Sequence, residues 1–275
     1  MTTLRQDLRN PENDMTTTAF TLEPTGIELR FRRVTLIARE WLTPSYVRVR
    51  LESPELAGFT SLGADDHIRI FFPEGDPLSV EEMRAAPNRE YTPLAWGDDW
   101  LDLEFAIHGD PASGTAGVAA AWAATAPLGS SAGVGGPRGS KVLAGRPDAW
   151  LLAGDETAVP AIRRFAQAMD ADAIGRVVVE VADAAHELAI DAPAGVVVEY
   201  AHRGDEPAGS ALTARLEAFT EADRPAGAVF GFVAAEQSIV KAGRALLLER
   251  WGLDAAQVIV KGYWKRGETE YHAPH

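Results

Sequence analysis

The chain has 275 residues, a length at which two domains are the default expectation. It contains no cysteine, which excludes disulfides, thiolate nucleophiles and cysteine-ligated iron–sulfur clusters. Its formal net charge of −14 argues against binding to nucleic acid or to an anionic membrane, because both need a basic face. No apolar run approaches the roughly 18 residues of a membrane span, and residues 1–28 are too polar for a signal peptide. We therefore expect a cytoplasmic protein, and a monomer.

Residues 1–28 show no hydrophobic periodicity and are expected to form a flexible arm. From residue 29 to residue 146 the pattern changes to short strands separated by turn signals. Positions 46–51 and 101–107 alternate between apolar and polar side chains, which is the period of a half-buried strand. Further short runs occupy 29–34, 67–72 and 90–94. Because helical crossovers are absent, these runs predict a closed antiparallel barrel of about six strands.

Residues 147–268 alternate strands with helices, which predicts an α/β domain with a parallel sheet. The expected strands are 150–153, 176–182, 196–201, 228–233 and 257–261. The expected helices are 158–169, 211–219 and 236–251. Residues 269–275 are expected to form a C-terminal tail.

One cluster in the first domain has the side chains that a flavin needs. Arg89, Tyr91 and Thr92 place a cation, an aromatic ring and a hydroxyl together, just before Pro93. The guanidinium suits a pyrophosphate, the phenol ring suits the edge of an isoalloxazine, and the hydroxyl suits a ring nitrogen. An exposed strand end with a packed tyrosine would explain the same residues.

A second segment of the first domain could hold the pyrophosphate. His108 and Gly109 end the next strand, and small residues at 114–117 open an alanine-rich helix that runs through Trp122 and Ala123. A helix N-terminus exposes backbone N–H groups and the positive end of a dipole to an anion. His108 could instead be a core histidine.

The junction between the first strand and the first helix of the second domain lies at 154–162. Asp155, Thr157 and Ala158 stand at the carboxyl end of the strand, where sheet ligands bind. The glycine-rich dinucleotide fingerprint is absent, and Thr157 could simply be the N-cap of the helix. Nothing in these side chains indicates proton abstraction.

These motifs occur together with a glycine-rich turn at 135–140 and an aromatic, basic segment at 261–267. In this order they resemble the siderophore-interacting protein family of ferredoxin-reductase-like flavoproteins, over residues 29–267. The resemblance implies an FAD-binding barrel followed by an NAD(P)-binding α/β domain. It implies a reductase of ferric siderophores that uses NADH or NADPH, with reduced ferredoxin as an alternative donor. FAD would carry the chemistry, so no catalytic side chain and no resident metal are expected.

The resemblance assigns candidate residues to each role. The cofactor contacts that it implies are Arg89, Tyr91, Thr92, Pro93, His108, Gly109, Trp122, Ala123, Asp155, Thr157, Ala158, Tyr263 and Trp264. The expected contacts to an anionic ferric chelate are Arg69, Arg138, Lys261 and Lys265. As to the donor, Asp183 would favour an unphosphorylated ribose, whereas Arg203 would favour NADPH.

Two other functions fit the same sequence. A general NAD(P)H:flavin reductase would share both domains but would lack the basic substrate mouth formed by Arg69, Arg138 and Lys261. A siderophore-binding carrier would contain FAD only as a structural group. Reoxidation of the reduced flavin by a ferric chelate would distinguish a reductase from such a carrier.

Overall fold

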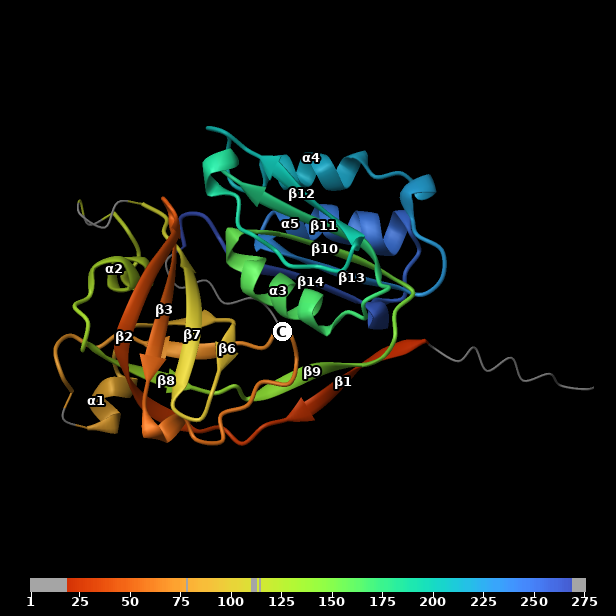
Figure 1. Ribbon diagram of the computed structural model, residues 1–275. Helices are drawn as coiled ribbons and strands as arrows, with labels where there is room; N and C mark the ends of the chain where they lie inside the picture. The colour runs from red at the N-terminus through yellow and green to blue at the C-terminus, as the bar shows by residue number, and fades with distance from the viewer. Residues whose placement is uncertain (1–18, 78, 110–112, 114, 269–275) are drawn as a thin grey trace, which may run out of the picture.

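The computed structural model describes residues 19–77, 79–109, 113 and 115–268. Two large sheets and a separate two-stranded ribbon divide these residues (Figure 1). An antiparallel sheet of seven strands comes first, and a parallel sheet of five strands follows it. The chain passes from one domain to the other between residue 145 and residue 149. The expected tail at 269–275 and the first 18 residues of the expected arm lie outside the described residues.

The antiparallel sheet has the strand order β5-β4-β8-β2-β3-β7-β6. Its strands are β2 (Phe31–Thr43), β3 (Tyr46–Glu52), β4 (Ile68–Phe71), β5 (Asn88–Tyr91), β6 (Ala95–Trp96), β7 (Trp100–Ala106) and β8 (Ser131–Gly135). Two short helices belong to this domain, α1 (Val80–Arg84) and α2 (Val118–Thr125). The alternation expected at 46–51 is confirmed, because Val47, Val49 and Leu51 are fully buried.

The sheet curls like a barrel but differs from the expected closed barrel of about six strands. It has seven strands, and no hydrogen-bonded ladder joins its edge strands β5 and β6 within the described chain. Thr92, Pro93 and Leu94 connect these two edges. Proline has no N–H to donate to a ladder, so the sheet opens at this point.

The expected flexible arm is wrong for its last residues. β1 (Phe20–Gly26) pairs antiparallel with β9 (Gly139–Gly145), and the two form a separate ribbon. Figure 1 shows this ribbon extending from the curled sheet beneath the parallel sheet. The ring of Phe20 is buried against Phe230 of the second domain, with ring centroids 6.0 Å apart.

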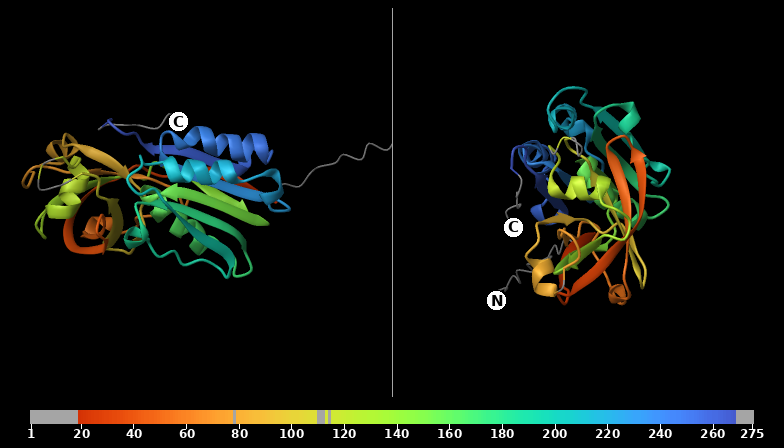
Figure 2. Two further views of the ribbon diagram at one scale, coloured as in Figure 1. Left: turned by 90° about the horizontal axis from the view of Figure 1, so that it is seen from above. Right: turned by 90° about the vertical axis from the view of Figure 1, so that its left-hand side faces the viewer.

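The second domain is the predicted α/β unit, with the strand order β12-β11-β10-β13-β14. Its strands are β10 (Ala149–Asp155), β11 (Ile174–Val181), β12 (Gly195–His202), β13 (Val229–Glu236) and β14 (Val258–Trp264). Its helices are α3 (Val159–Ala168), α4 (Ser210–Ala218) and α5 (Ile239–Arg244), and a π-helical turn at Ala245–Arg250 extends the last. α3 covers the face toward the first domain, while α4 and α5 lie side by side on the other face (Figure 2).

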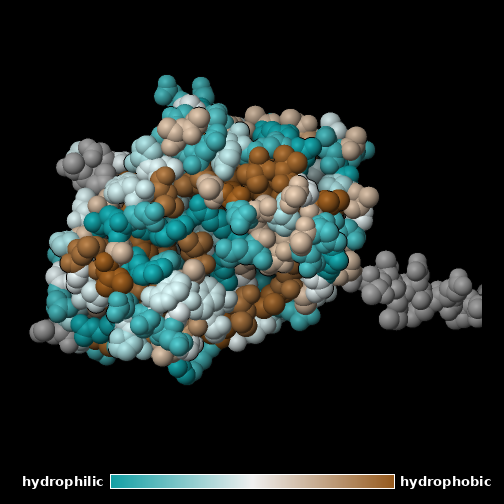
Figure 3. All heavy atoms as spheres, in the orientation of Figure 1, coloured by the Kyte–Doolittle hydropathy of each residue, from teal (hydrophilic) through white to brown (hydrophobic). Residues whose placement is uncertain are grey.

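Within the described part of the chain, no helix is both long enough and apolar enough to cross a membrane. Hydrophobic patches alternate with hydrophilic side chains on the face of the molecule shown in Figure 3.

Candidate cofactor and substrate cavity

A cavity of about 1630 Å³ lies between the two domains. We call it the interdomain cavity, since β4, β5 and α2 line one side and β14 lines the other. Pockets for a single small ligand usually measure about 300–1,000 Å³. The interdomain cavity is therefore large enough for a cofactor and a second molecule.

The flavin candidates of the first domain meet in the cavity wall. Arg89, Tyr91 and Thr92 all line it, whereas Pro93 is buried outside the wall. The Tyr91 ring packs on Phe105, with centroids 4.2 Å apart, and this contact fixes its orientation. Burial raises the pKa of Tyr91 well above that of a free phenol, so its hydroxyl remains protonated.

Helix α2 presents its N-terminus to the same cavity. Gly117, Val118, Ala119 and Ala120 line the wall, and no described side chain caps the first turn. A Cβ added at Gly117 would meet no atom within 4 Å, so the backbone can be approached closely there. The free N–H groups of this turn suit a phosphate.

The resemblance implied that Trp122 and Ala123 contact the cofactor, but neither residue lines the interdomain cavity. Helical periodicity turns them toward the core of the first domain instead. The Trp122 ring packs against Phe72 and Phe105, and Ala123 is fully buried. Residues 117–120, at the start of the helix, line the wall in place of Trp122 and Ala123.

These observations test whether FAD fits the chain. The guanidinium of Arg89, the uncapped turn of α2 and the protonated Tyr91 line one continuous wall. A cation, free N–H donors and an aromatic ring match the pyrophosphate and the isoalloxazine of FAD. The residues present fit the cofactor.

The opposite wall depends on a buried carboxylate. Asp155 is fully buried and accepts hydrogen bonds from Thr157 N at 3.0 Å and from Thr157 Oγ1 at 2.5 Å. Its second oxygen accepts from Glu236 N at 3.0 Å and from Trp264 Nε1 at 2.8 Å. Asp155 therefore positions Trp264. It was expected to contact the cofactor, but it does not line the cavity. The predicted N-cap at Thr157 is also wrong, because Asp155 caps the turn.

Trp264 joins the two domains at the cavity. Its ring stacks on His108, with centroids 4.8 Å apart and planes at 27°. His108, Gly109, Thr157 and Tyr263 line the wall beside it, whereas Ala158 is fully buried behind. Desolvation lowers the pKa of His108, so the neutral imidazole is favoured.

The cavity is more basic than the chain as a whole. Seven lysines and arginines line it, against five acids, although the whole chain has 26 of the former and 40 of the latter. The lining cations are Arg69, Arg89, Lys141, Arg244, Lys261, Lys265 and Arg266. An anionic ligand would therefore meet a locally positive surface.

Three of the four expected substrate residues lie in the cavity wall. Arg69, Lys261 and Lys265 line the cavity, whereas the exposed Arg138 does not. Arg69 pairs with Glu90 at 2.7 Å, and Lys261 pairs with Asp65 at 2.5 Å. No sequence motif indicated Lys141, which also lines the cavity. It lies on β9 opposite Pro24 of β1, which lines the cavity as well.

Comparison with known proteins identifies the family. Residues 35–141 match the siderophore-interacting FAD-binding domain, and residues 147–267 match the siderophore-interacting protein family. Ferric vibriobactin reductase ViuB of Vibrio cholerae is 31% identical over 259 residues, which cover 88% of this chain and 92% of that protein. This chain belongs to the siderophore-interacting protein family.

Two further relatives of this siderophore-interacting protein agree in length. The NADPH-dependent ferric-chelate reductase of Escherichia coli is 32% identical over 256 residues, which cover 86% of this chain and 94% of that protein. The crystal structure of a siderophore utilization protein from T. fusca has a TM-score of 0.77 and 32% identity. It covers 90% of this chain, and this chain covers 97% of it. This chain is thus an FAD-dependent oxidoreductase with the expected two-domain fold.

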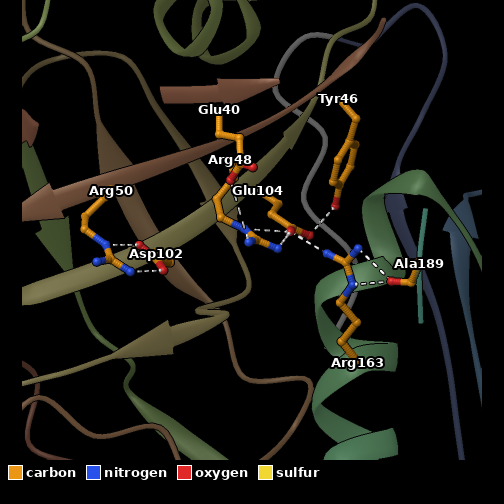
Figure 4. A network of polar contacts seen from close by, with 8 residues as sticks. All are labelled: Glu40, Tyr46, Arg48, Arg50, Asp102, Glu104, Arg163 and Ala189. Atoms are coloured by element: carbon orange, nitrogen blue, oxygen red, sulfur yellow. Dashed lines mark hydrogen bonds and ion pairs between the residues drawn. The ribbon is translucent and has the colours of Figure 1, made fainter. Parts of the chain in front are cut away.

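A group of polar side chains around the buried Glu104 joins the two domains beside the cavity (Figure 4). Glu104 of β7 accepts hydrogen bonds from Tyr46 Oη at 3.0 Å and from Arg48 at 2.7 Å. Arg163 of α3 also pairs with Glu104, and it donates to the Ala189 carbonyl at 2.9 Å. We call Tyr46, Arg48, Glu104 and Arg163 the Glu104 cluster. No sequence motif indicated it, because its members come from three separate elements.

Among the described residues, no group of three or more acids or histidines is arranged to hold a metal ion.

Proposed function

We propose that this chain is a ferric-siderophore reductase that takes electrons from NAD(P)H and passes them to chelated Fe(III). The observation that carries the proposal is the interdomain cavity, where a flavin-compatible wall and a surplus of cations face the same space. The names of the relatives from Vibrio cholerae and Escherichia coli support it. Its cytoplasmic location and its monomeric state stay predictions from the sequence.

Bound FAD supplies the redox chemistry, since it can accept two electrons as a hydride and release them one at a time. The protein binds and orients. Arg89 and the N–H groups of α2 would hold the phosphates, and Tyr91 would pack along the ring system. Trp264, positioned by Asp155 and stacked on His108, lines the wall on the side of the second domain.

An anionic ferric chelate enters on the basic part of the wall. Lys141 attracts it, and Arg69, Lys261 and Lys265 contribute while they remain paired with Glu90, Asp65 and Glu268. Reduction to Fe(II) loosens the chelate, because Fe(II) is a poorer match than Fe(III) for hard oxygen ligands. None of these reaction steps requires a side chain to transfer a proton.

The direct test uses the FAD-loaded protein, reduced with dithionite and mixed without oxygen with an anionic ferric siderophore. Stopped-flow absorbance should show reoxidation of the flavin, and an Fe(II)-specific dye should show the iron product. A reduced protein that reoxidises no faster with ferric siderophore than in buffer would refute the proposal and would leave a carrier role.

Lys141→Glu tests the basic wall. Charge reversal should raise KM for the anionic chelate about threefold to tenfold, and added salt should reduce the difference. Lys241→Glu is the matched control, because Lys241 is an exposed residue of α5 that does not line the cavity. Equal KM values for the two variants would place the chelate elsewhere.

A further inference from the structure

The parallel sheet of this chain has an unusual carboxyl edge. In such sheets, ligands bind beyond the carboxyl ends of the strands, where the strand order reverses. The order β12-β11-β10-β13-β14 puts this switch point between β10 and β13. A dinucleotide pyrophosphate would rest there on the N–H groups of a helix N-terminus.

A carboxylate of the chain already occupies the switch point. Asp155 ends β10 and accepts from Thr157 N, in the turn that opens α3, and from Glu236 N at the end of β13. Its hydrogen bonds thus span the two strands between which a phosphate would sit. The backbone is also closely packed there, since a Cβ added at Gly154 would lie 2.6 Å from the carbonyl oxygen of Ala234.

Two further strands of the sheet end in the same way. Glu180 of β11 is buried and accepts from Gly209 N at 2.6 Å and from Leu212 N at 2.8 Å, at the start of α4. Glu236 of β13 accepts from Ser238 N at 2.7 Å, just before α5. The N–H donors that could bind phosphate therefore have carboxylate partners within the chain.

The cation at this edge is also engaged. Arg203 follows β12, pairs with Glu156 at 2.8 Å, and lies 3.7 Å from Glu180. Its side chain is only 14% exposed. A 2′-phosphate of NADPH would have to displace Glu156 to reach it, and would meet Asp155 and Glu180 nearby.

We propose that this chain recognises a nicotinamide donor by its nicotinamide end alone, because Asp155, Glu180 and Glu236 close the sheet edge to the phosphates of the adenosine half. The inference rests on the proposed function in that NAD(P)H reaches the flavin. It predicts that the chain does not discriminate NADH from NADPH. It also predicts that the adenosine half contributes almost no binding energy, so that a truncated donor loses little.

Calorimetry of the FAD-loaded protein tests the closed edge without any turnover. ADP-ribose and 2′-phospho-ADP-ribose are the probes, and we expect dissociation constants weaker than about 1 mM. A tighter constant for either probe would overturn the inference. The titration remains decisive even if no nicotinamide reduces the flavin.

Anaerobic bleaching of the flavin supplies the second readout. Reduced nicotinamide mononucleotide, NADH and NADPH should give kcat/KM values within about tenfold of one another, since they share the recognised end. A larger loss for the mononucleotide would show that the adenosine half is bound.

Arg203→Ala tests whether Arg203 binds the 2′-phosphate of NADPH or serves only as the partner of Glu156. The ratio of NADPH to NADH kcat/KM should stay within about twofold of that of the unaltered protein, because Arg203 is held by Glu156. A fall in the NADPH value alone would contradict the inference. Using the ratio removes any general loss of folded protein, and Arg215→Ala, which removes a half-buried pair with Glu199, is the matched control.

The failure of this inference can be told apart from the failure of the proposed function. Chelate reduction by the dithionite-reduced protein does not involve a nicotinamide. If that reaction fails while ADP-ribose does not bind, the proposed function falls and the closed edge stands. If the reaction succeeds while ADP-ribose binds tightly, the reverse holds.

Discussion

Asp155 holds two elements of the second domain to Trp264 through a single carboxylate. Four donors converge on its two oxygens. In Asp155→Asn, one oxygen becomes an NH₂ group that faces N–H donors in either orientation. We expect the free energy of unfolding to fall by about 1–3 kcal/mol, because a buried donor loses its acceptor. Urea unfolding followed by tryptophan fluorescence measures this loss.

The control for Asp155→Asn is Asp183→Asn. Asp183 caps Ala185 N in the same way at 2.8 Å, but its side chain is 61% exposed, so water can replace the lost acceptor. Asp183→Asn should therefore change stability little. If both variants unfold at the urea concentration of the unaltered protein, the four hydrogen bonds of Asp155 do not position Trp264.

At the scale of elements, helix α2 faces the cavity with an uncapped first turn. Gly117→Ala should change the stability of the apoprotein by less than about 1 kcal/mol, because alanine adopts the φ of −63° freely but is a poorer N-cap than glycine. The added methyl would nevertheless occupy the space above the backbone that a phosphate needs. We expect weaker FAD binding, measured by titrating the apoprotein with FAD and following flavin fluorescence.

Arg89→Ala provides the comparison for this experiment. Loss of one charge-assisted hydrogen bond should weaken FAD binding roughly tenfold to a hundredfold without unfolding the protein. A Gly117→Ala protein that binds FAD as tightly as the unaltered protein, while Arg89→Ala loses it, would place the pyrophosphate away from α2.

The sequence could predict the elements whose pattern is local. β3 was predicted because buried Val47 and Val49 alternate with arginines, and α3 because its apolar residues follow helical spacing. β1 was missed because only Phe20 of its residues is buried and only Leu22 packs beside it, and two apolar positions are too few to establish a period. β6, the strand that lies at one edge of the antiparallel sheet, has two residues, which is too few for any periodicity.

At the scale of the whole molecule, the site could be predicted only where one motif carries it. Arg89, Tyr91 and Thr92 are close in sequence, and their place in the wall could be predicted from the motif. The pairing of Lys261 with Asp65 could not, because 196 positions separate them and only folding brings them together. Lys141 and the Glu104 cluster could not be predicted for the same reason, because folding brings distant segments together there.

The Glu104 cluster makes the two domains depend on each other. The Glu104 side chain has no exposed area, and it is shared between Arg48 of the first domain and Arg163 of the second. In Glu104→Gln, Arg163 would lose its counter-charge, and Arg48 would keep only Glu40, 4.0 Å away. We expect a fall of about 3–5 kcal/mol in the free energy of unfolding. We also expect two separate urea transitions, in contrast to the single transition expected of the unaltered protein, since the domains would then unfold independently.

Asp102→Asn is the matched control for Glu104→Gln. Asp102 lies two residues earlier on β7 and also binds an arginine, with both hydrogen bonds to Arg50 at 2.7 Å, but this pair stays within the first domain (Figure 4). Arg50 is also 43% exposed, so water can replace its partner. Asp102→Asn should therefore shift the unfolding midpoint less and should leave one transition. The role of Glu104 in joining the domains would be disproved if the two variants lost equal stability and both kept a single transition, because the loss would then reflect the strand pair alone.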